Sequence, residues 1–168
     1  VASALDAAGG HADALDGLLT GASVAAWAVL EPEPSDVFAL PSLEVRADGD
    51  DVVVSGRKRP IEAAPGADHL LVTGRPGEGW SQVLVPTDSA GLTITPMQTI
   101  DLTRRYAAAT FDDVRLPAGA LVGDLGGAAE QVRLQRMRAS VAHCAKSVGA
   151  MQRAFDMADA RSARHAPD

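Results

Sequence analysis

The sequence contains no asparagine and a single cysteine, Cys144, among its 168 residues. Without asparagine there is no N-glycosylation sequon, and a lone cysteine excludes an internal disulfide framework. No apolar run reaches the roughly 18 residues that a membrane-spanning helix needs. The N-terminus lacks the basic region and apolar core of a secretory signal. We therefore expect a cytoplasmic protein without a membrane partner.

Patterns of a metal centre and of a dinucleotide-binding fold are also missing. The four histidines show no metal-ligand spacing, and no second cysteine accompanies Cys144. His143 and Cys144 are adjacent, so on a helix their side chains point apart and cannot form a dyad. No Gly-x-Gly-x-x-Gly segment follows a strand, and we interpret residues 74–79 as a hairpin loop.

Positive charge is in deficit, because 15 Lys and Arg stand against 22 Asp and Glu, for a net charge of −7. A general nucleic-acid surface or anionic-membrane surface is therefore not expected. Hydrophobic residues make up 46% of the chain, which is ordinary for a globular protein. The length suffices for one domain with a core, or for one domain and part of another.

The pattern of apolar residues divides the chain into three parts. Residues 1–20 have helical spacing, which Gly9-Gly10 should interrupt and Gly21 should end. Seven short β-rich runs follow, and Asp48-Gly49 between two of them predicts a hairpin. The predicted strands are Val24–Leu30, Leu43–Ala47, Asp51–Ser55, His69–Thr73, Ser81–Val85, Leu92–Thr95 and Tyr106–Asp112.

Beyond Gly126 the period becomes helical and predicts one long helix over residues 128–164. Its apolar seam consists of residues spaced alternately four and three apart, namely Met137, Val141, Cys144, Val148, Met151, Phe155 and Ala158. Such a seam needs partner helices, and we expect Cys144 to be a packed core residue. Because residues 1–20 could cover only part of the seam and the chain begins at Val1 rather than Met, we expect an incomplete chain.

These parts together predict an α+β fold. A mostly antiparallel β-barrel or sandwich is flanked by an N-terminal helical piece and by the long C-terminal helix of an incomplete bundle. The expected boundaries are residues 1–21 for the first helical part, 22–124 for the β domain and 125–168 for the last helix.

The stretch Val24–Asp36 joins a predicted strand to a loop with prolines, one hydroxyl and several carboxylates. Proline cannot donate to a sheet ladder, so the strand should stop before this loop. A stiff loop at a strand end can hold a ligand, and the alternative is a plain surface turn.

This stretch resembles the acyl-CoA dehydrogenase family, whose central domain has an aromatic-x-x-Thr-Glu-Pro-x-x-Gly-Ser-Asp segment. Trp27 stands at the aromatic position, Leu30 at the threonine, Glu31-Pro32 at Glu-Pro, and Ser35-Asp36 at Ser-Asp after a one-residue shortening. Further similar segments follow in the family's order, at residues 48–58, 66–72, 83–86, 91–93, 111–117 and 148–154. The resemblance covers about residues 15–164.

The resemblance implies a flavoprotein that oxidises the Cα–Cβ bond of an acyl-CoA thioester with FAD as acceptor. It also implies a homo- or hetero-oligomer, in which a neighbouring subunit holds the adenine end of FAD. The positions that match the family's flavin contacts are Trp27, Val29, Leu30, Ser35, Pro60 and Glu62.

Three of these positions depart from the family pattern. Leu30 replaces a threonine whose hydroxyl meets the flavin, and Pro60 replaces the tryptophan that flanks its ring. Glu62 replaces a threonine, and a carboxylate there would repel an anionic reduced flavin. We therefore expect flavin binding to be weakened.

No catalytic base is identified in the sequence. In some family members the base is a glutamate on the long helix, but the matching position here is Ala139, and Ser140 stands where an arginine usually follows. Arg136 and Arg138 are candidates for binding a CoA phosphate, or they belong to a solvated helix face. The arginines in residues 101–105 are candidates for an interface, a phosphate contact or a structural salt bridge.

Two functional hypotheses remain open. The first is a flavin-dependent acyl-CoA dehydrogenase, of which this chain alone would be inactive. The second is a non-catalytic partner subunit of such an enzyme, suggested by the substitutions at Leu30, Pro60 and Glu62. A flavin monooxygenase on the same fold is a third possibility that no residue favours.

Overall fold

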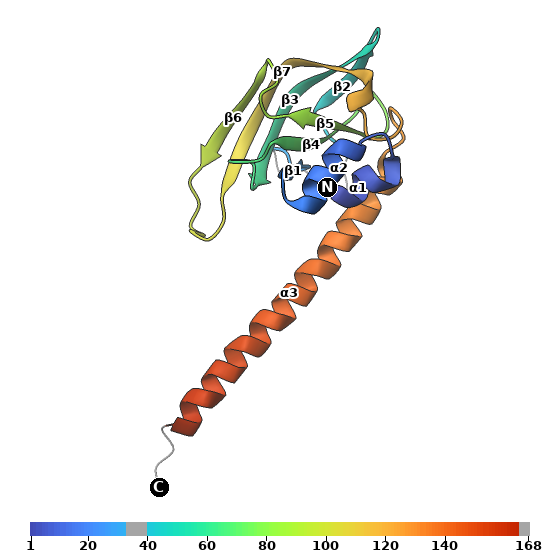
Figure 1. Ribbon diagram of the computed structural model, residues 1–168. Helices are drawn as coiled ribbons and strands as arrows, with labels where there is room; N and C mark the ends of the chain where they lie inside the picture. The colour runs from blue at the N-terminus through green and yellow to red at the C-terminus, as the bar shows by residue number, and fades with distance from the viewer. Residues whose placement is uncertain (33–39, 165–168) are drawn as a thin grey trace. The chain divides into compact units, whose positions relative to one another are not determined.

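The computed structural model describes residues 1–32 and 40–164, with side chains up to residue 161 (Figure 1). Candidate residue Ser35 and its neighbour Asp36 lie outside the described residues. The chain divides into two compact units, Val1–Gln131 and Val132–Asp168, which we describe separately.

Two short helices open the first unit. Helix α1 spans Ala2–Ala8 and helix α2 spans Ala12–Thr20. Between them Gly9 and Gly10 have φ angles of 69° and 77°, a left-handed conformation that glycine adopts without a steric penalty. Gly21 ends α2 in the left-handed helical conformation, with φ 78° and ψ 11°, so the predicted interruption and the predicted end are confirmed.

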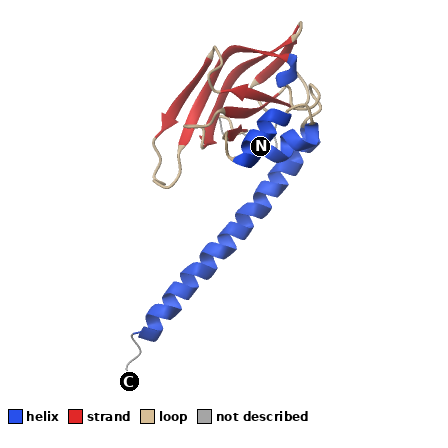
Figure 2. Ribbon diagram, in the orientation of Figure 1, coloured by secondary structure: helices blue, strands red, loops and turns tan. Residues whose placement is uncertain are grey.

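Within the described residues seven strands follow, and they form two sheets (Figure 2). The smaller sheet has the order β1-β4-β5, and the larger has the order β2-β3-β7-β6. Four of the five strand pairings are antiparallel and the β1–β4 pairing is parallel. The strands are β1 (Ala25–Ala28), β2 (Glu44–Asp48), β3 (Asp51–Glu62), β4 (His69–Gly74), β5 (Ser81–Pro86), β6 (Leu92–Met97) and β7 (Tyr106–Pro117).

A single apolar core fills the space between the two sheets, which makes the domain a sandwich. From the smaller sheet, Leu70 and Val72 of β4 and Val83 and Val85 of β5 enter this core. Alternate residues of the larger sheet face them, because successive side chains of a strand point to opposite sides. The larger sheet contributes Val45, Val52, Val54, Ile61, Ala107, Ala109, Phe111, Val114 and Leu116.

The outer face of the smaller sheet is also covered. Leu71 of β4 and Leu84 of β5 pack there with Leu5 of α1, and residues of α2 lie against the same cluster. Because both faces are covered, β4 and β5 are almost continuously buried, and the burial includes the polar residues Thr73, Ser81 and Gln82.

The two longest strands extend further than the sequence predicts. The prediction ended one at Ser55, but β3 continues through Pro60 to Glu62. Its register with β7 shifts between Val54 and Gly56 and again between Lys58 and Ile61. Pro60 lies inside the second shift, where a residue without an N–H group does not break a regular ladder.

The second unit consists of helix α3 from Val132 onward; the whole helix spans Ala129–Arg164, one residue shorter than predicted. The seam residues Met137, Val141, Val148, Met151 and Phe155 are each more than half exposed. Cys144 is exposed as well, whereas the sequence predicted a packed residue.

None of the helices in the described part of the chain combines the length and the apolar character that crossing a bilayer would require.

We expect this chain on its own to self-associate through the apolar seam of α3, because a patch of this size usually marks an interface. Sedimentation velocity should show species larger than a monomer. Replacing Val148 and Met151 by Glu should return the chain to a monomer. The matched control, Ala139→Glu with Ala150→Glu, adds the same charges on the opposite side of the helix and should not. A monomeric wild-type chain would contradict the prediction.

Candidate functional site

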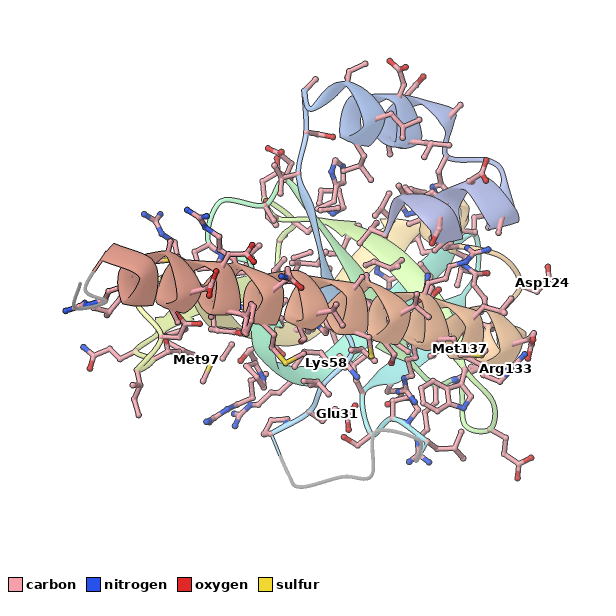
Figure 3. The ribbon with its side chains drawn as sticks, turned by 90° about the horizontal axis from the view of Figure 1, so that it is seen from below. Glu31, Lys58, Met97, Asp124, Arg133 and Met137 are labelled. Carbon is pink, nitrogen blue, oxygen red and sulfur yellow. The ribbon has the colours of Figure 1, made fainter. Side chains whose placement is uncertain are left out.

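The centre of the candidate site is an ion pair between Lys58 of β3 and Glu31, which follows β1. The Lys58 ammonium Nζ lies 2.7 Å from Glu31 Oε1, and the exposed fractions of the two side chains are 0% and 7% (Figure 3). Removing such charges from water is costly, so a buried lysine is stable only beside a compensating group. Here the carboxylate provides that compensation.

The Glu31 carboxylate accepts further hydrogen bonds from Ser42 and Leu43. The Ser42 amide donates to both carboxylate oxygens at 2.9 and 2.8 Å, the Ser42 hydroxyl donates at 2.6 Å, and the Leu43 amide donates at 3.0 Å. Burial would raise the pKa of Glu31, but the hydrogen bonds from Lys58, Ser42 and Leu43 outweigh it and lower the pKa to about 2. The group is therefore an ionised anchor rather than a proton donor near neutral pH.

The same ion pair fixes the main chain where β1 ends. The ladder between β1 and β4 stops at Ala28. Beyond it, Lys58 Nζ donates to the Val29 carbonyl at 3.3 Å, and the Arg59 amide donates to the Leu30 carbonyl at 2.9 Å. The segment after β1 is thus tied to β3 just before Pro60.

These bonds bring several predicted flavin positions to one edge of the domain. Leu30 is exposed and its carbonyl accepts a bond from the residue that precedes Pro60. Pro60 is exposed, Glu62 is exposed two residues further along β3, and Val29 is half-buried. The resemblance implies one site for these positions, and the Arg59–Leu30 hydrogen bond joins Leu30 to the Pro60 segment.

The Glu62 carboxylate is not an isolated charge. Arg104 Nη1 lies 3.2 Å from Glu62 Oε1, and Arg104 Nε lies 3.6 Å from Asp101. A hydrogen bond to Tyr106 is the largest cause that raises the pKa of Arg104, followed by the negative charge of Glu62. The guanidinium reduces the repulsion that a bare carboxylate would exert on an anion nearby, and it makes a structural salt bridge of the kind considered for residues 101–105.

Two open hollows adjoin the ion pair of Glu62 and Arg104. One has a volume of about 630 Å³ and is lined by Met97, Leu102 and Tyr106, among others. The other, of about 380 Å³, is lined by Glu62, and both hollows share Arg104 and Arg105. The edge that carries Glu62 therefore has concave surface beside it.

The side chain of Trp27 forms its hydrogen bond with Thr73, not with the residues of this edge. Its indole N–H donates to the Thr73 hydroxyl at 3.0 Å, and the buried amide of Gln82 donates to the same hydroxyl at 3.2 Å. The ring packs against the outer cluster of the smaller sheet, together with residues of α1 and α2. Its N–H is thus already used within the fold.

The predicted CoA-phosphate residues belong to the second unit. Arg136 and Arg138 both lie on α3, with exposed Ala139 and Ser140 after them. Residues two apart on a helix do not face each other, so one ligand group on one side of α3 cannot meet both arginines.

The pairing of Glu31 with Lys58 was not predicted from the sequence. Both residues stood inside motifs, but nothing in the motifs joined them. The available signal was a lysine at an inward position of an apolar strand, because such a residue needs a buried carboxylate partner. In the described residues no group of three or more His, Cys, Asp or Glu side chains could hold a metal ion.

Comparison with known proteins gives consistent relatives. No family model matches the chain. It is 32% identical over 165 residues to the acyl-CoA dehydrogenase FadE12 of Mycobacterium tuberculosis, an alignment that covers 91% of this chain and 42% of the relative. The chain thus spans less than half the length of the curated relatives it matches.

Solved structures agree with this result. A probable acyl-CoA dehydrogenase from Mycobacterium abscessus superimposes with a TM-score of 0.89 at 26% identity, over 98% of this chain and 46% of that one. A glutaryl-CoA dehydrogenase from Mycobacterium smegmatis, in complex with FADH2, superimposes with a TM-score of 0.70 at 26% identity, over 80% and 36%.

Glu31 should make the stability of the fold depend on pH in the acid range. Its pKa is about 2 when folded against an ordinary 4.5, so its contribution is complete above pH 4.5 and is lost as pH falls towards 2. The shift corresponds to a contribution on the order of 3 kcal/mol to the free energy of unfolding. In urea unfolding measured from pH 7 to pH 2, Glu31→Gln should have a much lower free energy of unfolding than wild type at neutral pH. The difference between the two free energies should shrink in acid.

The control for that experiment is Glu78→Gln, which removes an exposed carboxylate from a loop of the same domain. A gap between wild type and Glu31→Gln that stayed constant down to pH 2 would contradict the assigned role of the ionised carboxylate.

Proposed function

Because the chain belongs to the acyl-CoA dehydrogenase family, we propose that it forms the flavin-side part of an enzyme that oxidises the Cα–Cβ bond of an acyl-CoA thioester, with FAD as acceptor. The observation that carries the proposal is the edge formed by Leu30 and the Pro60–Glu62 segment, which the Arg59–Leu30 hydrogen bond joins. A cytoplasmic location and an oligomeric assembly belong to the same proposal.

The residues at this edge fit a flavin that is held by main-chain groups and apolar contacts. Leu30 and Pro60 offer exposed apolar surface without a hydroxyl or an aromatic ring. The Glu62 charge is compensated by Arg104, so the edge is not strongly anionic. These features support a flavin held less tightly than by the family's threonine and tryptophan.

When bound, FAD supplies the acceptor for the hydride that leaves the β-carbon. In the proposal, Val29, Leu30 and Pro60 would hold the flavin through main-chain groups and apolar contacts. Arg136 or Arg138 would bind a phosphate of CoA from whichever side of α3 faces it. Ala139 carries no carboxylate, so the proposal assigns the base that removes the α-proton to no residue of this chain.

The test of this function uses the protein in its natural length, loaded with FAD and mixed anaerobically with acyl-CoA thioesters of increasing chain length. Bleaching of the flavin absorbance by at least one thioester, with formation of the enoyl product, is expected. A flavin-loaded protein that no acyl-CoA reduces would overturn the proposed reaction.

The second candidate is a non-catalytic partner subunit of a heteromeric acyl-CoA dehydrogenase. The substitutions at Leu30, Pro60 and Glu62 favour it, because all three remove contacts that the family makes with flavin. In that case the natural-length protein would bind no FAD by itself, and FAD and dehydrogenase activity would appear in a complex with a second family member.

The chain of 168 residues, purified by itself, should retain no stoichiometric FAD. Leu30 and Pro60 each lack a contact worth about 1 kcal/mol, and the two losses together weaken binding roughly thirtyfold. The measurement is an absorbance spectrum after incubation with FAD and desalting. A flavin band near one per chain would show that main-chain contacts suffice.

In the natural-length protein, the combination Leu30→Thr, Pro60→Trp and Glu62→Thr should tighten FAD binding. The matched control makes the same kinds of change at exposed positions elsewhere on the β domain, Ile100→Thr, Pro117→Trp and Glu44→Thr. Equal FAD affinities for the two triple variants would contradict the role given to these three positions.

A further inference from the structure

We propose that Glu31 and Lys58 are positioning residues for the flavin-facing edge, an inference that rests on the proposed function. Neither side chain belongs to the exposed edge itself, because both are buried beneath it. Their effect would be to hold Val29 and Leu30 at a fixed distance from Pro60.

The chain loses the support of the β1–β4 ladder after Ala28. Strand β1 is four residues long and its pairing with β4 ends there. Val29 and Leu30 are nevertheless held, because Lys58 Nζ and the Arg59 amide donate to their carbonyls. Two consecutive residues of β3 therefore take over from the ladder.

Lys58 is itself held in place by Glu31. Its ammonium is held by Glu31 at 2.7 Å, and Glu31 is held in turn by the amides of Ser42 and Leu43. Leu43 is a fully buried residue of the sandwich core. These bonds thus fix the position of the lysine, and with it the position of the edge, relative to the core.

Strand β3 is irregular next to Lys58. The register of β3 with β7 shifts between Lys58 and Ile61, so the ladder does not define this part of the strand as it does elsewhere. Pro60 lies within the shift and has no N–H group to donate. A directional contact at Lys58 is therefore placed where the sheet constrains the backbone least.

The chemistry of the Glu31–Lys58 ion pair suits a positioning role. Replacing a buried ion pair by apolar residues of similar volume is often neutral for stability, so stability alone does not account for the pair. Charge-assisted hydrogen bonds are short and directional, which apolar contacts are not. An ion pair at this place fixes geometry, and the geometry it fixes is that of the edge.

The experiment compares the natural-length wild type with the double variant Glu31→Gln, Lys58→Met, which removes both charges and approximately preserves volume. Three quantities are measured: the melting temperature, the dissociation constant for FAD, and amide hydrogen exchange by NMR. The control double variant is Ser55→Ala with Asp113→Asn, which removes another hydrogen-bonded pair of β3, at 2.6 Å, away from the edge.

We expect the double variant to melt near the wild-type temperature, while its affinity for FAD falls roughly tenfold, the equivalent of about one hydrogen bond. Exchange of the Arg59 amide should become at least tenfold faster, while core amides such as those of Val72 and Val83 keep their wild-type rates. The control should change neither the Arg59 exchange nor the FAD affinity.

Unchanged exchange at Arg59 in the double variant would overturn the proposal whether or not FAD binds. Faster exchange with unchanged FAD affinity would overturn it too, because the edge would then not be the flavin contact. A wild type that binds no FAD would instead refute the flavin part of the proposed function. Should the double variant not fold, Glu31→Asp, which keeps the charge but shortens its reach, is measured in the same way. Its Arg59 amide should exchange faster and its affinity for FAD should fall, while the core amides keep their wild-type rates.

Discussion

A lysine ammonium that has no access to water dictates much of this structure. Lys58 sits on an inward position of β3, and its charge is tolerable only because Glu31 meets it. That requirement fixes where the chain must go after β1, since the carboxylate has to reach under β3. It also fixes where the chain returns, because Ser42 and Leu43 bind the same carboxylate. One buried charge thus sets the path of the chain both after β1 and before β2.

Around this pair the sandwich supplies rigidity by ordinary means. The smaller sheet is covered on both faces, by the larger sheet on one side and by α1 and α2 on the other. The larger sheet, by contrast, carries one of its two register shifts at the candidate edge, between Lys58 and Ile61. The arrangement places an adjustable part of the backbone against a firm one, which is a common way for a scaffold to present a binding surface.

The features that could be predicted from the sequence are those with a strong local signal. The period of apolar residues located α3 to within one residue, and the glycines at positions 9, 10 and 21 located the helix ends. The end of β3 could not be predicted, because the turn-forming residues Gly56 and Pro60 are accommodated by register shifts. The Glu31–Lys58 pair and the Glu62–Arg104 pair escaped prediction for a different reason: each joins residues far apart in the chain, and a single sequence contains no term that links them.

The parallel pairing of β1 with β4 has a consequence for how the domain folds. Ala25 pairs with His69, and β2 and β3 lie between these strands in the chain, so β1 cannot pair with β4 until β2, β3 and β4 have been synthesised. Contacts between distant residues cost loop-closure entropy before they return any stabilisation, and chains rich in them fold slowly. On the ribosome, β1 would emerge early and stay without its partner strand until β4 follows, and during that interval α1 and α2 are the parts of the fold already available to cover Trp27.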